Sequence, residues 1–116
     1  MSQVIDLKDV LERVQDDKEL LLELFDIFTE DFNSKRDQFW KALEKHDLVA
    51  FQHLAHGLKG ATGNISAQQM HENCVNLDKM GKEGNMLNAK PALELLDRQF
   101  AEFKVEAARL KAQFGK

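Results

Sequence analysis

The chain has 116 residues, the usual size of one domain, so residues 1–116 are expected to form a single domain. It contains one cysteine, 16 basic and 20 acidic residues, with a formal net charge of −4. This composition excludes an internal disulfide and argues against non-specific nucleic-acid binding, and no apolar run approaches the roughly 18 residues that span a membrane.

The first half of the chain is predicted to be helical, because its apolar residues recur at spacings of three and four. Asp6 is expected to cap a short helix over residues 7–14. Asp16 or Asp17 can cap the next helical stretch, whose apolar stripe runs over residues 21–43. The stripe thins near its middle, which leaves open whether this stretch is one helix or two.

Three further helices are predicted in the second half. Asp47 can cap the first of them. Ser66, three residues before Gln69, is interpreted as the N-cap of the second, which is expected to end at Gly81. The last helix is expected to begin near Pro91 and to carry a regular apolar seam to the end of the chain. These elements predict an all-α fold, an antiparallel four-helix bundle with a short N-terminal capping helix.

The third predicted helix has an unusual number of glycines, with Gly57, Gly60 and Gly63 falling within seven residues. Gly63 can be explained as the residue that ends the helix. In a helix interior, Gly57 and Gly60 should each cost about 1 kcal/mol relative to alanine. Residues that break local rules without a local benefit are expected at functional sites.

Helical geometry places His56 on the side opposite the apolar stripe of this helix. The residues predicted to share its exposed face are Gln52, Lys59, Gly60 and Gly63, with His53 at the edge. An exposed histidine taken alone is usually a solvated surface residue. An imidazole beside a cation and bare glycine backbone, however, is typical of a nucleophile that another protein approaches.

The segment 55–67, Ala-His-Gly-Leu-Lys-Gly-Ala-Thr-Gly-Asn-Ile-Ser-Ala, resembles the signature of histidine-containing phosphotransfer (HPt) domains. The later segment 74–78, Cys-Val-Asn-Leu-Asp, is similar to the second part of that signature. The resemblance implies a helical bundle in which His56 is phosphorylated. It also implies that Lys59 balances phosphate charge and that Gly60 gives the partner access.

The sequence departs from the family pattern at a few positions. Ser66 stands where the family usually has glycine, which its predicted N-cap role would explain. Ala61 and Thr62 replace a common pair of serines, and Asp78 replaces glutamate or glutamine. Because that last position neighbours the active histidine in the family, the resemblance leaves open whether Asp78 makes a polar contact there.

The implied chemistry is phosphoryl exchange between His56 and the aspartate of a receiver domain. A neutral imidazole can act as the nucleophile near neutral pH. The sequence has no P-loop or kinase glycine-rich loop, so we expect a phosphoryl carrier and not a kinase. The expected partners are receiver domains or a hybrid sensor histidine kinase, with the divalent metal on the partner and no cofactor on this chain. We expect a cytoplasmic monomer, and Gly60, Gln52, His53 and Gly63 are predicted to contact the partner.

Two other functions remain open from the sequence alone. The chain could be a docking or adaptor module that never accepts phosphate. It could also be a metal-binding bundle that uses His53 and His56, joined by His46 or His71. The sequence is also compatible with the phosphorylated domain of a longer chemotaxis-type kinase, although Met1 and the clean cap at Asp6 favour a free-standing protein.

Overall fold

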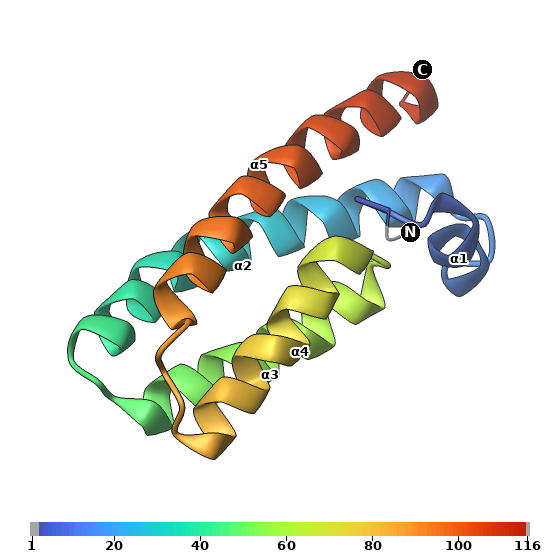
Figure 1. Ribbon diagram of the computed structural model, residues 1–116. Coiled ribbons are helices and arrows are strands. Elements are labelled where there is room, and N and C mark those ends of the chain that lie inside the picture. The colour runs from blue at the N-terminus through green and yellow to red at the C-terminus, as the bar shows by residue number, and fades with distance from the viewer. Residues whose placement is uncertain (1–2, 116) are drawn as a thin grey trace.

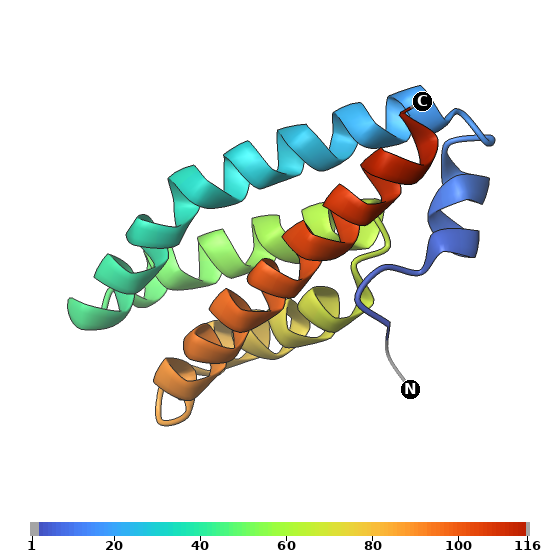
Figure 2. The ribbon, with the colours of Figure 1, turned by 90° about the horizontal axis from the view of Figure 1, so that it is seen from above.

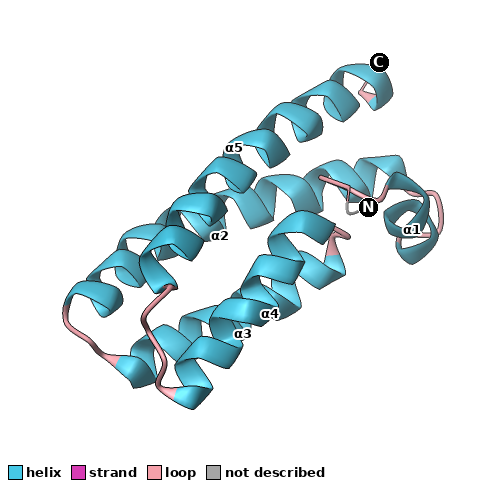
Figure 3. Cartoon of the chain, in the orientation of Figure 1, coloured by secondary structure: helices cyan, strands magenta, loops and turns pink. Residues whose placement is uncertain are grey.

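The computed structural model describes residues 3–115, and every regular element in that range is an α-helix (Figure 3). The helices are α1 (Leu7–Arg13), α2 (Lys18–Glu44), α3 (Leu48–Asn64), α4 (Gln68–Glu83) and α5 (Ala89–Phe114). None of the helices in this range is both long and apolar enough to cross a membrane.

The four long helices form a bundle in which α2 and α4 each pack against both α3 and α5 (Figures 1 and 2). Short connections join the four long helices, and each runs in the opposite direction to the one before it (Figure 2). The short helix α1 packs against α2, and the backbone N–H of Asp6 donates to the carbonyl of Ser66 at 2.9 Å. The predicted all-α bundle with a short N-terminal helix is confirmed.

Aspartate side chains begin the first three helices, as predicted. Asp6, Asp17 and Asp47 each accept a hydrogen bond from the backbone N–H of the third residue of α1, α2 and α3, respectively. Asp17, rather than Asp16, caps α2. The helix is continuous over residues 18–44, so the thinning of its apolar stripe does not break it.

A core rich in phenylalanine holds the bundle together. The rings of Phe25 and Phe103 pack edge to face with centroids 5.5 Å apart, which joins α2 to α5. Phe39 and Phe51 make a similar contact at 4.9 Å between α2 and α3. Cys74 is fully buried, and burial raises the pKa of its thiol to about 12. The buried core therefore fixes which face of α3 remains for function.

The prediction that Ser66 caps α4 is wrong. The N-cap is Ala67, without a side-chain hydrogen bond, and Ser66 lies in the turn with a φ of +54°. Its hydroxyl donates to the carboxylate of Asp9 on α1. A left-handed backbone is most easily adopted by glycine, so the turn geometry gives a physical reason for the glycine usual in the resembled signature.

The predicted end of α4 at Gly81 and the predicted role of Gly63 are also wrong. The helix α4 continues to Glu83 and is ended by Gly84, which has a φ of +68°. Likewise α3 extends beyond Gly63 to Asn64. Gly63 and Gly81 thus lie within the last turns of their helices and do not end them, so glycine at these positions needs another explanation. The last helix begins at Ala89, which places Pro91 in its first turn.

Candidate functional site

The exposed face of α3 carries His56, whose side chain is 61% exposed. The opposite face buries Phe51, Ala55 and Leu58 against the core, so packing determines the direction in which the imidazole points. The sequence prediction that His56 faces away from the core is confirmed.

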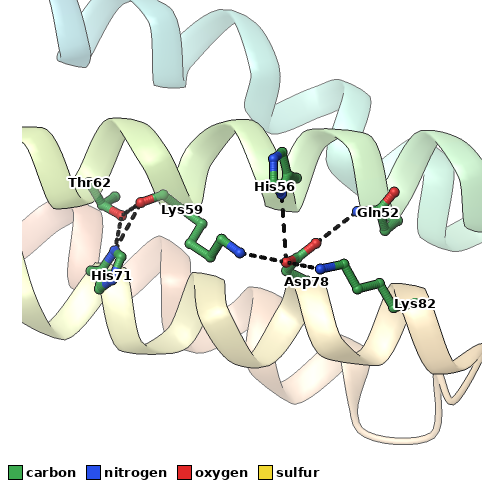
Figure 4. A network of polar contacts seen from close by, with 7 residues as sticks. All are labelled: Gln52, His56, Lys59, Thr62, His71, Asp78 and Lys82. Carbon is green, nitrogen blue, oxygen red and sulfur yellow. Dashed lines mark hydrogen bonds and ion pairs between the residues drawn. The ribbon is translucent and has the colours of Figure 1, made fainter.

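The carboxylate of Asp78 lies beside His56 at the centre of a polar network (Figure 4). Asp78 is on α4 and only 3% exposed. Its Oδ1 accepts a hydrogen bond from Nε2 of Gln52 at 2.9 Å. Its Oδ2 lies 2.9 Å from Nζ of Lys59, 3.3 Å from Nζ of Lys82 and 3.7 Å from Nδ1 of His56. The network therefore joins α3 to α4 under the exposed histidine.

Asp78 is ionised in this environment. Burial by itself would raise its pKa, but hydrogen bonds from Lys59, Gln52 and Lys82 outweigh burial and lower the pKa well below its ordinary value. Two lysine ammonium groups thus share one carboxylate. The immediate surroundings of the imidazole carry a net positive charge, which favours an incoming phosphoryl group.

His71 forms a second link between α4 and α3, next to Lys59. Its Nδ1 lies 2.9 Å from the carbonyl oxygen of Lys59 and 3.3 Å from Oγ1 of Thr62 (Figure 4). Because the carbonyl can only accept, Nδ1 carries the proton and donates it. The sequence predicted no role for His71 beside His56, whereas the structure shows that it holds the backbone from which the Lys59 side chain extends.

The glycines of the site fall into two groups. A Cβ atom added to Gly57 or Gly60 would meet nothing within 4 Å. A Cβ added to Gly63 would lie 3.3 Å from the ring of His71, and one added to Gly81 would lie 2.7 Å from Cβ of Gln52. Gly57 and Gly60 therefore leave open space beside His56, whereas Gly63 and Gly81 allow α3 and α4 to approach closely.

The structure brings some of the predicted site residues together at Asp78 and places the others elsewhere on α3. Gln52, His56 and Lys59 meet at Asp78. Gly60 and His53 are exposed, and helical spacing places both on the other flank of this face of α3 from Lys59. Gly63, predicted to contact a partner, packs against α4 of its own chain, which gives it an internal structural role.

From the sequence, the contact of Asp78 stays open and Lys82 is not predicted as a site residue. The available signal was the spacing of Asp78 and Lys82, four residues apart on one predicted helix. That signal is common on solvated helix surfaces and does not reveal that the carboxylate is buried. Only the packing of α4 on α3 brings both residues to His56.

The metal-binding alternative lacks a ligand set in the part of the chain that the structure describes. Within residues 3–115, no group of three or more histidine, cysteine, aspartate or glutamate side chains is placed to hold a metal ion. His71 uses its Nδ1 to bind the carbonyl of Lys59, and His56 points to solvent beside two lysines. A cation site would also be disfavoured by those positive charges.

Comparisons with known proteins agree with this architecture. The crystal structure of histidine-containing phosphotransfer protein B (HptB) from Pseudomonas aeruginosa PAO1 is similar, with a TM-score of 0.89 and 21% sequence identity. The similarity covers 98% of this chain and 99% of that one, which establishes a shared fold. A comparison with curated protein sequences gives no match. The Hpt domain family model matches residues 23–112, which include α3, α4 and the whole Asp78 network. The chain therefore belongs to the Hpt domain family, and its function is histidine phosphotransfer in a phosphorelay.

Proposed function

We propose that His56 is the residue that accepts the phosphoryl group and passes it on, in exchange with the aspartate of a receiver domain. The observation that carries this assignment is the position of the imidazole, 61% exposed and adjacent to a buried carboxylate that holds two lysines. His53 is also exposed on α3, but it lies outside this network.

The orientation of the ring favours Nε2 as the nucleophilic atom. Nδ1 faces the carboxylate of Asp78 at 3.7 Å, so a proton on Nδ1 is electrostatically favoured there (Figure 4). The neutral imidazole then has its lone pair on Nε2, at the opposite side of the ring from Asp78. This tautomer presents its nucleophilic atom to a partner and keeps its proton next to a negative charge.

The reaction is a displacement at phosphorus. The Nε2 lone pair forms the N–P bond while the bond between phosphorus and the aspartyl oxygen of the receiver breaks, and the carboxylate leaves with that electron pair. The imidazole retains its Nδ1 proton and becomes positively charged, next to Asp78. The reverse reaction returns the phosphoryl group to a receiver aspartate, so the chain acts as a carrier and requires no ATP site.

Lys59 and Lys82 supply the positive charge that balances the phosphoryl group. Both ammonium groups already lie beside His56 on Asp78, so little rearrangement is needed to reach the phosphoryl oxygens. We expect the divalent cation of the reaction to be bound by the receiver domain and no cofactor to be bound by this chain. The corresponding location is the cytoplasm, and the expected state is a monomer.

The test is phosphoryl transfer from a purified receiver domain that has been phosphorylated with acetyl phosphate. The wild-type chain should become labelled, and His56→Gln should abolish labelling while its helix content stays unchanged. His53→Gln is the matched control and should retain labelling. If labelling is lost in His53→Gln and retained in His56→Gln, the assignment of the phosphoryl group to His56 is wrong. A wild-type chain that binds receivers but never becomes labelled would instead be the adaptor module that the sequence left open.

A further inference from the structure

An open groove lies between the first turns of α3 and the last turns of α4. It is lined by Leu48, Val49, Gln52, Gly81 and Lys82. Gln52 and Lys82 also contact the carboxylate of Asp78. The groove is therefore continuous with the polar network under His56.

The groove exposes apolar side chains on the same side of α3 as His56. Val49 is 81% exposed and Leu48 is 38% exposed. Val49 precedes His56 by seven residues, which is two turns of an α-helix, so both side chains project in nearly the same direction and lie about 10 Å apart along the axis. A single exposed valine needs no explanation. Two exposed apolar residues on a groove that reaches the phosphotransfer histidine indicate a contact surface.

The size of a protein interface places this groove within reach of any partner at His56. A stable interface buries about 800 Å² on each side, which corresponds to a patch of roughly 16 Å radius. A patch of this size centred on His56 includes Val49. On the other side of the imidazole, Gly57 and Gly60 present only backbone and open space, so they offer a partner no side chain to contact.

We propose that this groove is the docking contact for the receiver domain that exchanges phosphoryl groups with His56. It takes an apolar side chain from the receiver surface beside the phosphorylated aspartate, and Lys82 at its edge faces the negative charge of the acyl phosphate. Gly57 and Gly60 leave room for the aspartate itself. The inference rests on the proposed role of His56, and it makes Val49 a residue that determines which receivers are accepted.

The test compares Val49→Gln with the matched control Val105→Gln. Glutamine has a helix propensity at least as good as that of valine, so both variants should fold. Val105 is 71% exposed and belongs to the C-terminal half of α5, which extends away from α3 and α4 (Figure 1). A panel of receiver domains is phosphorylated with acetyl phosphate, and the receiver that labels the wild-type chain fastest is used as the donor. Phosphoramidate serves as a small donor that labels histidine without docking.

Val49→Gln should lower the second-order rate of transfer from the receiver about tenfold, equivalent to about 1.4 kcal/mol of lost docking. The effect should appear mainly as a raised half-saturating receiver concentration. Val105→Gln should transfer like the wild type, and phosphoramidate should label all three proteins equally.

The possible failures can be told apart. If receiver transfer to Val49→Gln equals that to the wild type, the docking inference is overturned while the role of His56 stands. If His56→Gln becomes labelled, the proposed role of His56 is wrong, and the docking inference that rests on it falls as well. If sedimentation shows a wild-type dimer that Val49→Gln dissociates without a change in transfer, the groove binds a second copy of this chain and the inference is again overturned.

Discussion

Glycine is used for opposite purposes on two sides of α3. On the open face, formed by Gly57 and Gly60, an added Cβ would meet no atom within 4 Å. In the seam, where α4 packs on α3, a Cβ on Gly81 would lie 2.9 Å from the backbone Cα of Gln52. The glycines of the open face weaken the helix and leave open space beside His56, whereas Gly81 lets two helices approach closely. The difference shows that a glycine motif acquires its meaning from what faces it.

The largest effect is expected on the open face, from Gly60→Gln. The fold should be retained or stabilised, because the position is empty and glycine disfavours helix. The new side chain would stand where the receiver must bring its aspartate to His56. Since a misplacement of about 1 Å can cost a hundredfold in rate, transfer from the receiver should fall by about that factor.

The measurements for Gly60→Gln are the thermal midpoint and the rate of receiver-dependent transfer on the same preparation. Gly60→Ala is the control and should raise the free energy of unfolding by up to about 1 kcal/mol. An unfolded Gly60→Gln protein would show that this glycine serves packing after all. A folded variant with normal transfer would show that the partner does not cover this face.

In the seam, Gly81→Ala should destabilise the protein. The added Cβ would approach backbone and side-chain atoms of Gln52, so α3 and α4 would have to move apart, at a cost of about 1–3 kcal/mol. Urea unfolding measures this loss. Gly57→Ala is the matched substitution on the open face and should instead stabilise the helix. If the two variants show the same change in unfolding free energy, the two glycine environments are not different.

A smaller effect is expected in the seam from acid. Burial alone would raise the pKa of Asp78 above its ordinary value of 3.8. The hydrogen bonds that Asp78 accepts from Lys59, Gln52 and Lys82 outweigh burial and lower this pKa. A carboxyl group with a lowered pKa contributes stability that is present above about pH 4 and is lost as the pH falls toward the folded-state pKa. The difference in unfolding free energy between wild type and Asp78→Asn should therefore shrink below pH 4, by on the order of 1 kcal/mol. A difference that stays constant from pH 6 to pH 2.5 would contradict this role of Asp78.

Much of the site could be predicted from the sequence, because it depends on one helix. The exposure of His56 and its proximity to Gln52 and Lys59 follow from helical spacing within α3, and the structure places all three at one carboxylate. Asp78 and Lys82 come from α4, so their contact with His56 depends on how two helices cross. Spacing within a single helix holds no information about that crossing.

The same limit explains the errors at the turns. Ser66 is a residue type that favours N-caps and has the expected spacing to Gln69. In the folded chain, however, it adopts a φ of +54° and its hydroxyl donates a hydrogen bond to Asp9 on α1. The partner of this hydroxyl is far away in sequence, so a local signature cannot predict it. The wrong prediction of a helix end at Gly81 has a similar cause. The glycine at this position is explained by the close approach of Gln52, which is a contact between helices and leaves no local signature.

Local sequence is sufficient to predict the helices, the aspartate caps of the first three, the all-α bundle and the direction in which His56 points. These features depend on backbone hydrogen bonds and apolar periodicity over a few residues, which local sequence specifies. The tertiary structure alone decided that Asp78 is buried with two lysines beneath the imidazole and that Gly81 lies against Gln52. It also decided that the groove at Val49 opens next to the site. These features depend on the distance and register between α3 and α4, which are set when the core packs as a whole.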